Sequence, residues 1–169
     1  MDYQYKQEVS INVKNSSLVG ELTIPFNATA LIIFSHGSGS GRNSPRNQKI
    51  AQYLHQKRFA TLLMDLLTEE EDTIYQNRFD ITLLSNRLVE VTKWLQVNSL
   101  TRNFQIGYFG ASTGATSAIK AAVVLADDIK VIVSRGGRPD LALDILDKVI
   151  SPTLLIVGSL DTDVLDLNK

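Results

Sequence analysis

Several residue types are absent or scarce in this sequence of 169 residues. It has no cysteine, which excludes disulfides, thiolate metal ligands and a cysteine nucleophile. It has two histidines, His36 and His55, and these are the two candidates for a histidine that acts as general base. No apolar run approaches the roughly 18 residues of a membrane span, and residues 1–13 lack the apolar core of a signal peptide. We therefore expect a soluble, cytoplasmic protein with no membrane contact.

The charges of the chain are nearly balanced, with 17 basic and 18 acidic residues and a net charge of -1. A net charge so close to zero gives no reason to expect binding to nucleic acid or to an anionic membrane surface. The expected partner is a small molecule.

Short aliphatic runs and stretches with helical spacing take turns along the chain, which predicts an α/β fold around a mostly parallel sheet. The beginning differs, because residues 8–13 and 18–24 flank the turn-forming Asn15, Ser16 and Ser17 and predict an antiparallel hairpin that ends at Pro25. The run at 30–34 is apolar on both faces and predicts a central strand. No linker or repeat divides the chain, so one domain is expected over residues 1–169.

The remaining elements follow from periodicity and capping residues. The acidic segment 68–75 has no apolar period and is predicted to be a loop. Asp80 is a candidate cap for a helix with a single apolar stripe, which packs on one face of the sheet. Further strands are predicted at 59–64, 105–109, 130–134 and 153–157, and further helices at 45–57, 113–125 and 141–146, giving helices on both faces.

The motif with the most chemical content is Gly-Ala-Ser-Thr-Gly at residues 110–114, between a predicted strand and a helix of small residues. This is the setting of a nucleophile elbow, in which a sharp turn holds the serine in a strained conformation and only small neighbours fit. Ser112 is the candidate nucleophile. The helix that starts at Thr113 directs its free N–H groups toward the developing oxyanion. A simple helix cap would not need both Gly110 and Gly114.

A glycine-rich loop at residues 35–44 follows the central strand. In folds with a nucleophile elbow, a loop at this place supplies a second N–H group for the oxyanion. A nucleotide-binding loop is the competing interpretation, but Arg42 stands where a dinucleotide motif needs glycine, and no Gly-Lys-Ser follows. We therefore expect no cofactor and no metal. His36 lies within this loop and is interpreted as a hydrogen-bonding residue that shapes it, and His55 as a surface or packing residue of the first helix.

The acid of a catalytic triad follows a later strand in this fold, after the nucleophile in the chain. Asp161 fits that position, with Asp140 and Asp163 as alternatives that the sequence leaves open. Arg135 and Arg138 follow the preceding strand at the sheet edge where substrates bind, and are candidates for holding a substrate carboxylate or phosphate. Ion pairs or hydrogen bonds within their own loop are the alternative.

Five segments of the chain together resemble a known family. They are Phe-Ser-His-Gly-Ser-Gly-Ser (34–40), Ser-Pro-Arg-Asn (44–47), Gly-Tyr-Phe-Gly-Ala-Ser-Thr-Gly (107–114), Ser-Arg-Gly-Gly-Arg-Pro-Asp-Leu (134–141) and Pro-Thr-Leu-Leu-Ile-Val-Gly (152–158). With these segments the chain resembles the dienelactone hydrolase-like branch of the α/β-hydrolases, in particular its serine-bearing members, some of which are fused to phosphoribosyltransferase domains. The resemblance implies an α/β-hydrolase fold with Ser112 as nucleophile and Asp161 as acid. It also implies an oxyanion hole formed by the backbone N–H groups of Ser38 and Thr113.

Two departures from the family shape the expected function. Ser112 replaces the cysteine of dienelactone hydrolases, so their lactone substrate does not transfer directly. Family members continue with another strand, the catalytic histidine and a final helix, so the domain is expected to be incomplete at its C-terminus and its activity impaired. We expect an esterase or acyl hydrolase for a small ester or lactone, and the alternative is a non-catalytic remnant or ligand-binding domain. The apolar strand at 153–157 would be left at an edge and is a candidate for self-association.

Overall fold

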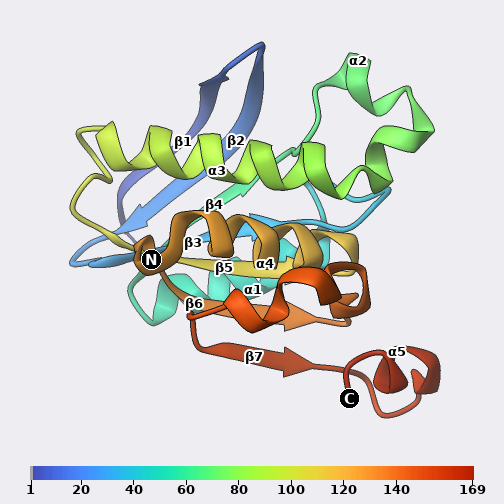
Figure 1. The fold of residues 1–169 in the computed structure, drawn as a ribbon. Coiled ribbons are helices and arrows are strands. Elements are labelled where there is room, and N and C mark those ends of the chain that lie inside the picture. Colours follow the sequence, from blue (N-terminus) through green and yellow to red (C-terminus); the bar gives the residue numbers. More distant parts are fainter. Residues whose placement is uncertain (1) are drawn as a thin grey trace.

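The computed structural model describes residues 2–169, which form one seven-stranded sheet in the order β1-β2-β4-β3-β5-β6-β7 (Figure 1). β1 pairs antiparallel with β2, β2 pairs antiparallel with β4, and every other pair is parallel. The predicted hairpin and mostly parallel sheet are confirmed. The strands are β1 (Tyr3–Val13), β2 (Ser16–Pro25), β3 (Ala30–Ser35), β4 (Phe59–Met64), β5 (Gln105–Ala111), β6 (Ile129–Arg135) and β7 (Thr153–Ile156).

Helices cover both faces of the sheet, as predicted. α3 and α4 pack together over one face, while α1 packs on β4 from the other (Figure 1). Asp80 caps α3 as expected, because its carboxylate accepts a hydrogen bond from the N–H of Leu83 at 2.9 Å. The α-helices are α1 (Pro45–Gln56), α2 (Glu69–Asp72), α3 (Ile81–Val97), α4 (Thr113–Leu125) and α5 (Thr162–Asp166), with short 3-10 helices η1 (Tyr75–Phe79), η2 (Ala126–Asp128) and η3 (Pro139–Lys148).

The sheet separates two apolar clusters of unequal size. The larger lies under α3 and α4 and includes Leu88, Leu95 and Ile119, all buried. The smaller lies under α1 and contains Phe34 and Phe109, whose ring centroids are 5.1 Å apart. The strands β3 and β5 are buried from both sides, which holds their carboxyl ends in place at the edge where the predicted site lies.

Three predicted segments differ in the structure. The acidic segment 68–75 contains α2, because Thr68 and Glu71 form a reciprocal capping box at its start. The predicted helix at 141–146 is instead part of η3, with a kink at Ala142. α5 follows β7 where no helix was predicted. α2 and α5 are helices of four and five residues, too short to show the apolar period that marks a longer helix.

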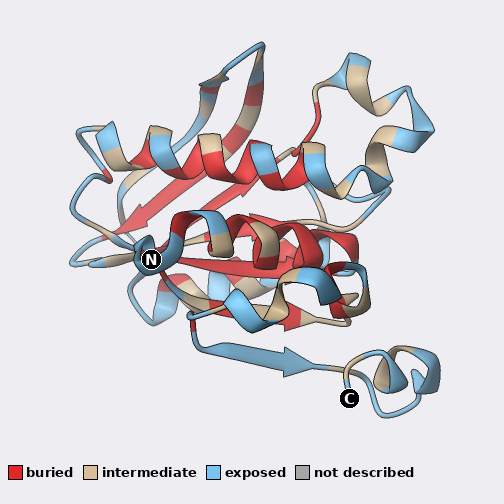
Figure 2. Cartoon of the chain, viewed as in Figure 1, coloured by how far each residue is buried: buried red, intermediate tan, exposed pale blue. Residues whose placement is uncertain are grey.

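The strand β7 differs from the rest of the sheet in its exposure (Figure 2). All four of its residues are exposed, including Leu154, Leu155 and Ile156, and it pairs with β6 along one edge. Within residues 2–169, no helix combines the length and the apolar character that crossing a bilayer requires.

Candidate active site

The sharp turn between β5 and α4 presents Ser112. Its backbone has φ 52° and ψ -127°, outside the regions that non-glycine residues ordinarily occupy, and its side chain is exposed. The Ser112 N–H donates to the carbonyl of Arg135 at 3.3 Å, which holds the turn against the end of β6. The turn therefore has the strained strand-to-helix geometry that the sequence motif predicted.

Two glycines make this close approach possible. A Cβ on Gly110 would lie 2.4 Å from the Cα of Ala115, and one on Gly114 would lie 2.2 Å from the carbonyl oxygen of Ser35. These contacts are with backbone atoms, which cannot move aside as a flexible side chain can. The start of α4 is thereby packed directly against the loop that follows β3.

The two predicted oxyanion donors lie close together beside Ser112. The Ser38 N–H donates to the Thr113 side-chain oxygen at 3.2 Å, which ties the loop after β3 to the start of α4. Thr113 is the first residue of α4, so its N–H has no acceptor in a preceding helical turn. A Cβ on Gly37 would lie 3.0 Å from the Cβ of Ser112, so this loop passes directly over the serine.

Ser112 opens into a cavity of about 440 Å3 between the loop after β3, the start of α1 and the end of β6. Among the described residues, its lining includes two arginines and no carboxylate. The lining residues are Gly37, Ser40, Ser44, Pro45, Arg46, Asn47, Ala111, Ser112 and Arg135. The cavity is large enough for a small-molecule substrate.

The candidate acids lie outside this lining. Ala111, Arg135 and Ile156 are neighbours across β5, β6 and β7, so Asp161 follows the same sheet edge two strands away from Ser112. The Asp161 side chain is exposed at the start of α5 and forms no capping hydrogen bond. Asp163 is also exposed. The structure therefore brings Asp161 to the expected edge without joining it to Ser112.

His36 is held by the loop, as the sequence suggested. Its Nδ1 lies 3.0 Å from the Gly37 carbonyl and its Nε2 accepts from the Leu66 N–H at 3.1 Å, which assigns the proton to Nδ1. Burial lowers the pKa of His36, and the hydrogen bond to the Gly37 carbonyl, together with the charges of Asp65 and Asp72, opposes this effect. Both ring nitrogens are thus used in fixing the loop that carries Ser38.

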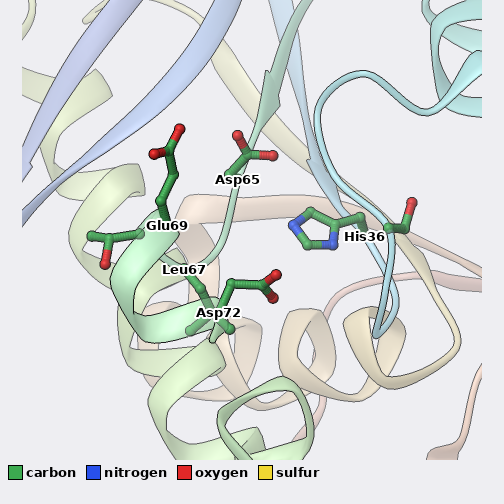
Figure 3. A pocket seen from close by; sticks show the side chains of 7 residues that line it. His36, Asp65, Leu67, Glu69 and Asp72 are labelled. Carbon is green, nitrogen blue, oxygen red and sulfur yellow. The ribbon is translucent and has the colours of Figure 1, made fainter. Parts of the chain in front are cut away.

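The His36 ring borders a second cavity of about 210 Å3, which the sequence did not predict (Figure 3). Asp65, Glu69 and Asp72 also line it, and Asp65 forms an ion pair with Arg42. The acidic run at 69–72 was the available signal, but it gave no indication that its carboxylates meet Asp65. This cavity is acidic where the Ser112 cavity is basic.

His55 is buried rather than on the surface. Its Nε2 lies 2.7 Å from the Thr61 hydroxyl and its ring meets Tyr3 edge to face. Burial, assisted by the charge of Lys6, lowers the pKa of His55 from 6.5 to about 4. His55 therefore helps to pack α1 on the sheet and is not placed to act as the base of a triad.

Acidification is expected to destabilise the fold through His55. Between pH 6.5 and 4 the His55 imidazole is protonated in the unfolded chain and neutral in the folded chain, so protonation favours unfolding. The contribution of neutral His55 to the free energy of unfolding is therefore complete above pH 6.5 and is lost as the pH falls toward 4. The loss amounts to roughly 3 kcal/mol of unfolding free energy. Urea denaturation at several pH values measures it, and the variant His55→Gln should show a shallower pH dependence. Equal pH dependence in both proteins would contradict this role.

The two candidate arginines have different surroundings. Arg138 forms two hydrogen bonds with Asp140, at 2.8 and 2.7 Å, and this pairing raises the pKa of Arg138 and lowers that of Asp140. It thus takes the ion-pair alternative that the sequence left open. Arg135 lies over the Phe109 ring, 5.8 Å from its centroid, and burial together with the charge of Arg46 lowers its pKa.

Comparisons with known proteins agree with this geometry. A dienelactone hydrolase from Anabaena variabilis superimposes with a TM-score of 0.94 at 49% identity, covering 97% of this chain and 78% of that protein. A Mycobacterium tuberculosis protein named "Putative phosphoribosyl transferase" is 48% identical over 163 residues, and the chain spans 37% of its length. The esterase Est1E from Butyrivibrio proteoclasticus shares the fold, with a TM-score of 0.78 at 16% identity. No family model matches the sequence.

The sheet order, the helices on both faces and these structural matches define an α/β-hydrolase fold. The identity and coverage of the Anabaena protein go further than the fold. The chain belongs to the dienelactone hydrolase family.

Proposed function

We propose that the chain is a serine hydrolase of the esterase or acyl-hydrolase type, with Ser112 as nucleophile and a small-molecule ester or lactone as substrate. The observation that carries the proposal is the exposed Ser112 hydroxyl in a strained turn at the start of α4, open to a cavity of about 440 Å3. Family membership supports the same reaction class. The cytoplasmic location expected from the sequence stays a prediction.

In the proposed reaction Ser112 attacks the substrate carbonyl while a base removes the hydroxyl proton. The oxyanion that forms accepts hydrogen bonds from the N–H groups of Ser38 and Thr113, at the positive end of α4, and it replaces the Thr113 hydroxyl as the acceptor for Ser38. Collapse expels the alcohol and leaves an acyl group on Ser112, which water then removes. Asp161 is proposed as the acid that would orient the base.

We propose that turnover is impaired in the chain as it stands, because both histidines are engaged elsewhere. His36 bonds the Gly37 carbonyl and the Leu66 N–H, and His55 bonds Thr61 beneath α1. A serine hydroxyl is a weak nucleophile without a base. The same observation favours a second candidate, a ligand-binding domain that keeps the cavity without turnover.

Labelling with a fluorophosphonate probe tests the proposal. We expect slow labelling of the chain alone and at least about tenfold faster labelling when imidazole is supplied in solution, since general base catalysis contributes on the order of a hundredfold or more. The exposure of Ser112 leaves room for a free imidazole beside it. Mass spectrometry of the labelled peptide identifies the modified residue.

Two serine variants serve as controls for this experiment. Ser112→Ala should abolish labelling, whereas Ser40→Ala, at an exposed position in the same cavity, should retain it. Labelling that survives in Ser112→Ala would overturn the assignment. Absence of labelling at any imidazole concentration, with the fold intact, would favour the ligand-binding alternative.

A further inference from the structure

The charges that line the Ser112 cavity are unusual for a neutral ester site. Arg46 lies in the first turn of α1 and Arg135 ends β6, and both border the cavity with Ser112. Neither forms an ion pair within residues 2–169, whereas Arg42, Arg78, Arg87 and Arg138 all do. Two guanidinium charges therefore face one cavity without a compensating carboxylate.

The Arg135 guanidinium is held in place and only partly solvated. Its side chain stacks over Phe109, and its Nη1 is buried without a hydrogen-bond acceptor among residues 2–169. Orphaned donors of this kind are uncommon in folded proteins, and a buried charge without a partner is costly. An anion in the adjoining cavity would supply the missing countercharge.

The start of α1 adds two polar features to the same wall. Residues 44–47 form its first turn, so the positive end of a 12-residue helix faces the cavity. Asn47 is only 3% exposed, and no described residue donates a hydrogen bond to its Oδ1.

We infer that the Ser112 cavity recognises a substrate bearing a phosphate monoester group, held by Arg46 and Arg135 beside the nucleophile. A phosphate monoester carries close to two negative charges at neutral pH and matches the two guanidinium groups, while a carboxylate carries one. The inference rests on the proposed function in treating this cavity as the substrate site. The inference assigns substrate binding to Arg46, which the sequence did not suggest. Arg138, which the sequence did suggest, is instead paired with Asp140.

Equilibrium binding to the Ser112→Ala protein tests this assignment without requiring any chemistry. The probes are phenyl phosphate, benzoate and the neutral benzamide, titrated calorimetrically at low ionic strength. We expect phenyl phosphate to bind at least about tenfold more tightly than benzoate, because its second negative charge allows it to pair with both guanidinium groups, and we expect the neutral benzamide to bind more weakly still. Benzoate binding as tightly as phenyl phosphate would overturn the inference of a phosphate group.

Variants of each arginine locate the site. Arg46→Ala, at an exposed position, and Arg135→Ala should each weaken phenyl phosphate binding about tenfold or more. Arg102→Ala removes an exposed arginine at the opposite end of β5 and should change the affinity less than about twofold. Arg135→Lys keeps the positive charge at this position. If Arg135→Lys binds phenyl phosphate and Arg135→Ala does not, the weaker binding of Arg135→Ala comes from the lost contact and not from misfolding. Unchanged affinity for phenyl phosphate in both Arg46→Ala and Arg135→Ala would overturn the assignment.

The binding and labelling results are independent of each other. Tight binding of phenyl phosphate without labelling of Ser112 would contradict the proposed hydrolase while leaving the anion site standing. Labelling of Ser112 with equal binding of all three probes would contradict the anion site alone.

Discussion

Substitution of Gly114 by alanine is expected to lower the free energy of unfolding by more than about 4 kcal/mol, or to prevent folding. The added Cβ would lie 2.2 Å from the Ser35 carbonyl oxygen and 2.3 Å from that of His36. Both atoms belong to the backbone, so relief requires the loop after β3 to move away from α4. Such a movement would also separate the Ser38 N–H from Thr113.

Gly158→Ala is the matched control for this substitution. Gly158 follows β7 and does not need a positive φ, and no heavy atom of the described part of the chain lies within 4 Å of the added Cβ. Its unfolding free energy should change by less than about 1 kcal/mol. Urea denaturation of the three proteins measures both values. A Gly114→Ala protein as stable as Gly158→Ala would mean that the contact between α4 and the loop is much looser than described.

The second large effect is expected in the association state of the chain. Pro152 and Ile156 direct their carbonyls toward β6, accepting from Ile132 at 3.0 Å and Gly136 at 2.7 Å. Because alternate residues of a strand direct their backbone groups to opposite sides, Thr153 and Leu155 direct theirs to the free edge. We therefore expect chains to associate through β7, forming dimers or larger species in sedimentation velocity at micromolar concentrations.

Two substitutions at one position test this association. Leu155→Pro removes the outward N–H and leaves the hydrogen bonds with β6 in place, so it should give a monomer. Leu155→Ala keeps that N–H and should retain much of the association. A monodisperse wild-type monomer would show that this edge does not associate. A segment that covers the edge in a longer protein would suppress the association by forming the same backbone hydrogen bonds.

Features set by local sequence were largely predictable. β4 and α4 have the predicted bounds, and the cap of α3 is Asp80 as expected, because strand and helix periods and capping act over a few residues. The motif at 110–114 likewise predicted the strained turn at Ser112. The capping box of Thr68 and Glu71 was also visible in the sequence, but the acidic run around it favoured a loop.

The sequence by itself thus determined the α/β class, the strained turn and the position of Ser112 within it, since each depends on neighbouring residues and on the steric need for glycine. Only the tertiary structure decided which charges meet. It paired Arg138 with Asp140, buried His55 beneath α1, and brought Arg46 to Arg135 and Ser112 in one cavity. The reason is physical: a charged side chain takes its effect from the groups around it, and these come from strands and helices far apart in the chain.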